Sequence, residues 1–68
     1  MFEEGTKLMH YKGGKYTVIG VGTHSETTEE VLVYKNVADN RVWVRPLAMF
    51  YDEVVYKGKV VQRFSIIN

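Results

Sequence analysis

Turn-forming residues recur at intervals of roughly ten along this 68-residue chain, so no interval accommodates a long helix. The turns are supplied mainly by glycine, asparagine and aspartate, which adopt the backbone conformations that tight turns require. The segments between the turns are rich in β-branched and aromatic residues, which favour strands. The sequence therefore predicts a mainly β fold of five to six short antiparallel strands with at most one helical turn.

The clearest predicted hairpin centres on Gly13 and Gly14, a dipeptide suited to the positive φ angles of a two-residue turn. Such a turn sets Tyr11 opposite Tyr16 across the two strands. After the second strand, Gly20 and Gly22 indicate a bulge or bend, because a glycine inside a strand often marks one.

A second hairpin is predicted around Asp39 and Asn40, between residues 31–34 and 41–45. A two-residue turn at this point divides the side chains between two faces of the sheet. One face carries Val31, Val33, Val37, Val42 and Val44, and the other carries Leu32, Tyr34, Asn36, Trp43 and Arg45. The valine face is the predicted core face.

Three shorter signals complete the prediction. Residues 27–30 match a capping box, which leaves a helix over residues 29–36 as an alternative, although alternating valines favour a strand. Pro46 favours one helical turn over residues 47–51. The Lys57-Gly58 dipeptide predicts a last two-residue hairpin turn. Because small sheets commonly hide their edges by closing, the fold class is an SH3-like barrel or roll.

Composition and charge restrict the broad class of protein. Apolar residues make up 46% of the chain and charged residues 25%, which is typical of a globular domain, so residues 1–68 are expected to form a single domain with a loosely ordered tail at residues 1–5. The chain has no cysteine, an acidic N-terminus and no apolar run of the roughly 20 residues that span a bilayer, which favours a cytoplasmic protein without a membrane partner. We expect a monomer or a small homo-oligomer.

Several blocks of sequence, taken together, are more specific than any single short motif. They are His10-Tyr11-Lys12-Gly13, His24-Ser25-Glu26-Thr27, Val33-Tyr34, Trp43-Val44-Arg45-Pro46-Leu47, Met49-Phe50 and residues 61–64. Their order and spacing over residues 6–67 resemble the small bacterial proteins grouped as domain of unknown function 1653. The resemblance implies an SH3-type β roll and carries no catalytic residues over to this chain.

The segment from His24 to Thr27 brings an imidazole, hydroxyls and the Glu26 carboxylate into one predicted loop. One interpretation is a small ligand-binding sensor or an enzyme centred on His24. The structural alternative is a polar loop whose side chains bond its own backbone. Adjacent residues of an extended chain point to opposite sides, so adjacency alone does not build a nucleophile and base pair.

Metal and cofactor sites are not predicted. His10 and His24 are fourteen residues apart, and without cysteine they match no compact set of zinc ligands. The glycine pairs lack both the spacing and the following helix of a phosphate-binding loop.

The most interesting surface combines Tyr34, Asn36, Trp43 and Arg45, which the predicted register places on one face. Aromatic rings and a guanidinium on one face can stack bases or hold a peptide. The alternative is that Trp43 fills the core.

The net charge of +1 does not by itself predict a polyanionic partner, so any nucleic-acid site must be local. We expect a noncatalytic binding module that recognises a nucleic-acid strand or a peptide. The sensor or enzyme at the His24 loop and an accessory or oligomerisation domain are the alternatives.

Overall fold

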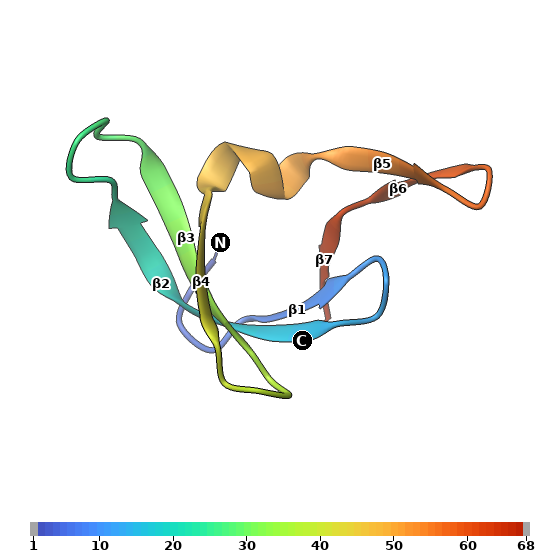
Figure 1. Cartoon of the computed structure of the whole chain (residues 1–68), viewed down its shortest axis with the longest axis horizontal. Helices are drawn as coiled ribbons and strands as arrows, with labels where there is room; N and C mark the ends of the chain where they lie inside the picture. Colours follow the sequence, from blue (N-terminus) through green and yellow to red (C-terminus); the bar gives the residue numbers. More distant parts are fainter. Residues whose placement is uncertain (1, 68) are drawn as a thin grey trace.

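The computed structural model describes residues 2–67, which form seven strands and one short 3₁₀ helix (Figure 1). The strands are β1 (Lys7–His10), β2 (Lys15–Thr23), β3 (Glu30–Asn36), β4 (Val42–Pro46), β5 (Glu53–Tyr56), β6 (Lys59–Gln62) and β7 (Phe64–Ile66). The helix, η1 (Leu47–Tyr51), follows Pro46 directly, as predicted. The capping-box alternative is wrong, because residues 30–36 form β3.

Five strands form one antiparallel sheet in the order β4-β3-β2-β1-β7, and β5 and β6 form a separate hairpin that extends from the body of the molecule (Figure 1). The mainly β prediction is confirmed, with more strands than expected. Across residues 2–67 the sheet does not close into a barrel, since β4 and β7 remain its two edges. The SH3-like topology stays a prediction.

The first hairpin has a different register from the predicted one. Leu8 lies opposite Tyr16, and the N–H of His10 donates to the carbonyl oxygen of Gly14, which closes a three-residue loop. The Nδ1 atom of His10 accepts the backbone N–H of Lys12 at 3.2 Å, which stabilises this longer loop. The predicted Tyr11–Tyr16 pair is therefore wrong, because the loop begins at Tyr11, two residues before the glycine pair.

The second hairpin is also longer than predicted, with the loop at residues 37–40 closed by Asn36 and Arg41. The Oδ1 atom of Asn36 accepts the N–H of Ala38 at 2.8 Å, and the Oδ1 atom of Asp39 accepts the N–H of Arg41 at 2.9 Å. The register changes by two residues, so the side chains keep their predicted faces. The last hairpin has the predicted register, with Val54 opposite Val61.

The core lies on the face opposite the predicted one. Its buried members come from β1, β2, β3, η1 and β7, and they are Leu8, Val18, Leu32, Tyr34, Phe50 and Phe64. The valine face is largely open, and Val44 is 60% exposed. The correction has a simple cause: η1 and β7 cover the Leu32 and Tyr34 face with aromatic rings, and their burial outweighs that of the smaller valines.

Aromatic contacts hold this core together. The ring of Phe50 on η1 lies 5.3 Å from that of Tyr34 and 4.7 Å from that of Phe64 on β7. Centroid distances in this range are typical of favourable aromatic pairs. At Gly20 the pairing of β2 with β3 shifts register, which confirms the predicted bulge.

The predicted N-terminal tail falls partly on Met1, which lies outside the described residues. Phe2 packs against Phe50, with ring centres 5.7 Å apart, and the N–H of Gly5 donates to the carbonyl oxygen of Val18. This segment therefore lies over the core.

Candidate functional site

The four residues of the predicted surface share a face but differ greatly in exposure. Tyr34 on β3 lies opposite Trp43 on β4. Tyr34 is only 4% exposed, whereas Trp43 is 43% exposed. The interpretation of Trp43 as core filler is therefore wrong, and Tyr34 forms the buried floor beside it.

The guanidinium of Arg41 lies over the ring of Trp43. The Arg41 guanidinium carbon lies 5.1 Å from the ring centroid, within the range of a cation–π contact. Asn36, also on this face, directs its Oδ1 to the N–H of Ala38, so its side chain stabilises the adjacent loop.

Arg45 reaches from β4 toward the opposite edge of the sheet. Its guanidinium carbon lies 5.7 Å from the centroid of Phe64 on β7. Its Nε atom is buried and has no hydrogen-bond partner within residues 2–67. Buried polar groups are nearly always hydrogen-bonded, so this donor requires explanation.

Arg63 joins β6 to β7 and has the same feature. Its backbone N–H donates to the carbonyl oxygen of Asp52, and its carbonyl oxygen accepts the N–H of Tyr11. These bonds fix the backbone, but the buried Nε atom of Arg63 also lacks a hydrogen-bond partner within the described chain.

His10 lies near both arginines. Its ring contacts Phe64 edge-on at 5.1 Å, and Phe64 is the residue directly opposite it on β7. Partial burial lowers the pKa of the His10 imidazole below its ordinary value of 6.5. The charges of Arg63, Lys12 and Arg45 lower this pKa further, in that order of size.

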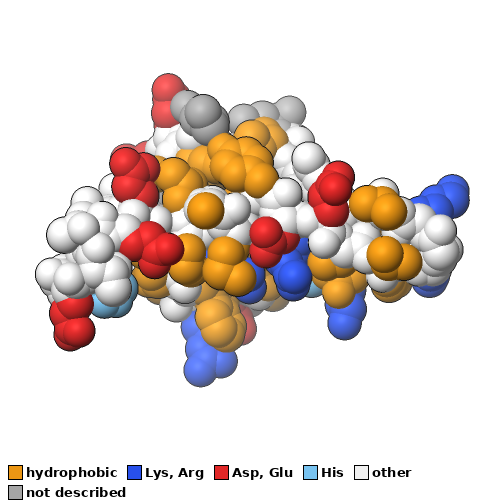
Figure 2. All heavy atoms as spheres, turned by 90° about the horizontal axis from the view of Figure 1, so that it is seen from above, with side chains coloured by type: hydrophobic (Ala, Val, Ile, Leu, Met, Phe, Trp, Pro, Cys, Tyr) orange, Lys and Arg blue, Asp and Glu red, His pale blue; other side chains and the backbone are white. Residues whose placement is uncertain are grey.

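We call Arg45, Arg63, Lys12 and His10 the basic cluster. Two tyrosines continue this region toward the β5–β6 hairpin, with the rings of Tyr11 and Tyr56 5.2 Å apart. Figure 2 shows Lys and Arg side chains mainly along one rim of the molecule and at one tip, while several acidic side chains lie on the face turned to the viewer.

The His24 loop has the geometry of a self-bonded turn. The Nδ1 atom of His24 accepts the backbone N–H groups of Glu26 at 3.1 Å and of Thr27 at 3.3 Å. The hydroxyl of Thr27 accepts the N–H of Glu29 at 3.2 Å. These contacts support the interpretation of this segment as a polar loop whose side chains hydrogen-bond its own backbone. No cluster of three or more His, Cys, Asp or Glu side chains suited to a metal occurs among residues 2–67.

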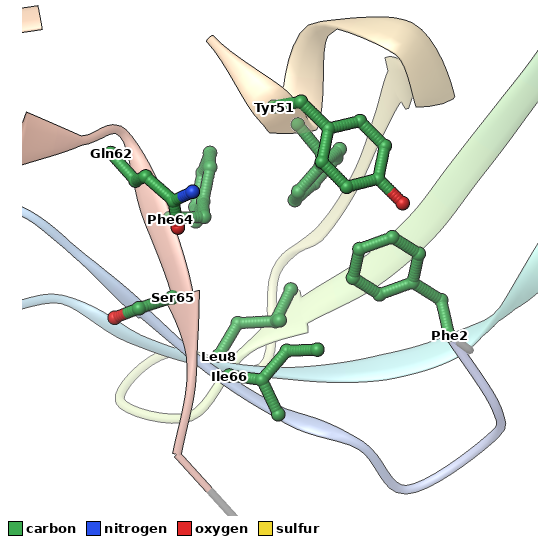
Figure 3. Close-up of a pocket in the computed structure, with 8 residues that line it drawn as sticks. Phe2, Leu8, Tyr51, Gln62, Phe64, Ser65 and Ile66 are labelled. Atoms are coloured by element: carbon green, nitrogen blue, oxygen red, sulfur yellow. The ribbon is translucent and has the colours of Figure 1, made fainter. Parts of the chain in front are cut away.

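An apolar pocket of about 330 Å³ lies on another side of the core (Figure 3). It is lined by Phe2, Leu8, Phe50, Tyr51, Gln62, Phe64, Ser65 and Ile66. Figure 3 shows the rings of Phe2 and Tyr51 at one side and Gln62 at the other. Nothing in the sequence predicted this pocket, because it depends on how the N-terminal segment, η1 and β7 meet.

Sequence reasoning also missed the convergence of the basic cluster. The only usable signal was that His10, Arg45 and Arg63 belong to separate blocks of the family resemblance. Which of these blocks meet depends on the curl of the sheet.

Comparison with known proteins gives a family and a fold. The model of the protein family of unknown function DUF1653 matches residues 6–66. A crystal structure of a DUF1653 protein from Bordetella bronchiseptica is 28% identical, with a TM-score of 0.84 over 97% of this chain and 87% of that one. No curated protein matches the chain. Within residues 2–67, no helix has the length and apolar character to cross a membrane.

Proposed function

The chain belongs to the DUF1653 family, and we propose that it is a noncatalytic binding module that holds a single-stranded nucleic acid across the face of β3 and β4. Trp43 stacks on a base, while Arg41 and Arg45 neutralise phosphates. Tyr34 and Asn36 support the face from below and from the adjacent loop.

The observation that carries this proposal is the exposed Trp43 ring with Arg41 beside it. A tryptophan in a small domain is a valuable core residue, yet here the ring is 43% exposed while the neighbouring Tyr34 is buried. Stacking of a base on an aromatic ring contributes about 1–3 kcal/mol and tolerates any base. The Arg41 guanidinium, 5.1 Å from the ring centroid, adds positive charge at the place where a phosphate would follow the base.

Charge favours a nucleic acid over a peptide. Arg41 and Arg45 lie at alternate positions along the edge strand with Trp43 between them, a spacing that suits a phosphate backbone next to a stacked base. A peptide on the same face is the alternative, and it would pair with the open edge of β4 through its backbone.

We also propose a cellular location, a topology, an oligomeric state and an alternative ligand site. The absence of cysteine from the 68 residues supports a protein of a reducing bacterial cytoplasm. An SH3-like topology is supported by the curl that brings β4 near β7, although the sheet stays open. We propose a monomer or a small homo-oligomer. The His24 and Glu26 loop is the alternative ligand site, but its imidazole acceptor already serves the loop backbone.

Amide chemical-shift mapping tests the proposal, with a labelled protein and a mixed-sequence single-stranded oligonucleotide at low and moderate salt. We expect shifts clustered at Asn36, Trp43 and Arg45 that weaken as salt rises. The Trp43→Ala variant should lose most of the response, whereas Val44→Ala on the opposite face should retain it. No movement at any oligonucleotide concentration would reject nucleic acid, and movement along β4 with peptide only would favour the alternative.

A further inference from the structure

Two arginines near His10 each have a buried Nε donor. The Nε atoms of Arg45 and Arg63 are both buried, and neither has a hydrogen-bond partner within residues 2–67. They are separated by eighteen positions in sequence, with η1 and the β5–β6 hairpin between them. A single unsatisfied donor is an isolated defect, but two from different parts of the chain near one histidine are consistent with a site for an acceptor.

Phe64 lies close to three members of the basic cluster. Arg45 approaches the Phe64 ring from β4 at 5.7 Å, and Arg63 is its immediate neighbour in sequence. His10 on β1 contacts the same ring at 5.1 Å. The basic cluster therefore spans both edges of the sheet and is anchored to a core residue that is only 5% exposed.

Among residues 2–67, no acidic side chain forms an ion pair with Arg45 or Arg63. Asp52 contacts Arg63 through its backbone carbonyl oxygen. A buried N–H donor without an acceptor is costly, so an anion that binds between the arginines satisfies these donors through charge-assisted hydrogen bonds.

His10 supplies a further donor. Because its Nδ1 atom accepts the N–H of Lys12, the neutral ring carries its proton on Nε2. Burial is the largest cause of the lowered pKa of His10, and the positive charges of Arg63, Lys12 and Arg45 lower this pKa further.

From this geometry we propose that Arg45 and Arg63, with Lys12 and His10, form a binding site for a phosphate group at the seam between β4 and β7. A tetrahedral phosphate offers oxygens to donors that approach from both sheet edges, which a planar carboxylate does less well. This inference extends beyond strand binding, because a free phosphate or a phosphate monoester satisfies it without any base on Trp43.

Phosphate titration of the full chain tests the site directly. The side-chain signals of His10 and the Nε–H signals of the arginines are followed by NMR as inorganic phosphate replaces chloride at constant ionic strength. We expect saturable shifts at Arg45 and Arg63, together with a rise in the pKa of His10 as the bound charge offsets that of the arginines. The second histidine, His24, lies in a distant loop and serves as the internal reference.

Matched variants distinguish a specific phosphate site from nonspecific attraction of phosphate to positive charge. Arg63→Gln and Arg45→Met should each weaken phosphate binding about tenfold or more, since each removes a charge-assisted donor. Lys35→Gln removes one positive charge from β3 on the opposite face of the sheet and should leave phosphate binding unchanged. Equal losses in all three variants, or non-saturable shifts that His24 shares, would overturn the proposal. If a variant fails to give a folded NMR spectrum, the wild-type titration alone decides.

Two ligand arms distinguish the sources of phosphate and keep this inference separate from strand binding. An oligonucleotide with a 5′-phosphate is compared with the same strand lacking it. Preference for the terminal phosphate, retained in Trp43→Ala, supports a monoester site at the seam. Saturable inorganic phosphate binding without oligonucleotide binding would reject the proposed function but support the site. Oligonucleotide binding with no response of Arg45 and Arg63 to phosphate would support the proposed function but reject the phosphate site.

Discussion

The guanidinium carbon of Arg45 on β4 lies 5.7 Å from the ring centre of Phe64 on β7, although these strands are at opposite ends of the five-stranded sheet. The sheet must therefore curl until side chains from its two edges touch. Twist and the bulge at Gly20 both promote such curling. As a result the fold has two open strand edges and a seam between them where polar side chains meet.

The exposure of Trp43 gives the simplest prediction. It is the only tryptophan of the chain, so its fluorescence reports on one position. We expect red-shifted emission that acrylamide quenches readily, because the ring is 43% exposed. Blue-shifted, protected emission would place the ring inside the core and would remove the basis of the proposed strand binding.

Stability should depend on pH through His10. Its folded-state pKa lies below the value of 6.5 expected for the unfolded chain, because of burial and the charges of Arg63, Lys12 and Arg45. Between these two pKa values the unfolded chain binds more protons, so the free energy of unfolding falls as the pH is lowered below about 6.5. Urea unfolding at a series of pH values measures this loss.

The His10→Asn variant isolates the contribution, since an asparagine oxygen can still accept the N–H of Lys12. Its stability should vary less between pH 6.5 and the range where carboxylates titrate, roughly pH 4. The same slope in His10→Asn as in the wild type would assign the pH dependence to another group.

Phe50 should dominate the stability of the molecule. Its ring is buried between Tyr34 and Phe64, so Phe50→Ala removes aromatic contacts and leaves a cavity. Such truncations cost about 3–5 kcal/mol, which a domain of this size scarcely tolerates. Met49→Ala, one residue earlier and exposed, should cost less than about 1 kcal/mol. Equal losses in thermal unfolding would contradict the assigned core.

Much of the fold was predictable because it depends on local chemistry. Turn residues located the hairpins, Pro46 located η1, and β-branched content distinguished β3 from a helix. The core face was not predictable in the same way. Alternating valines and alternating larger side chains are equally good strand patterns, and only the arrival of Phe50 and Phe64 from later in the chain decides which face is covered.

The same limit applies to the candidate site. The pairing of Tyr34 with Trp43 follows from a hairpin and preserves the predicted face even though the loop is two residues longer. The approach of Arg45 to Phe64 depends on the curl of the whole sheet, which no local pattern encodes. Sites within one hairpin are therefore more accessible to sequence reasoning than sites between sheet edges.

The turn between β1 and β2 supplies the last prediction. Gly13 has a φ of +103°, which side chains rarely adopt, so Gly13→Ala should destabilise the fold by about 1–2 kcal/mol. Gly20→Ala is the matched control, because its φ is not in that region and a Cβ there has open space. Removing a strand glycine of this kind should be neutral or slightly stabilising. Chemical denaturation of both variants measures the difference, and a Gly13→Ala protein as stable as Gly20→Ala would contradict the positive φ at Gly13.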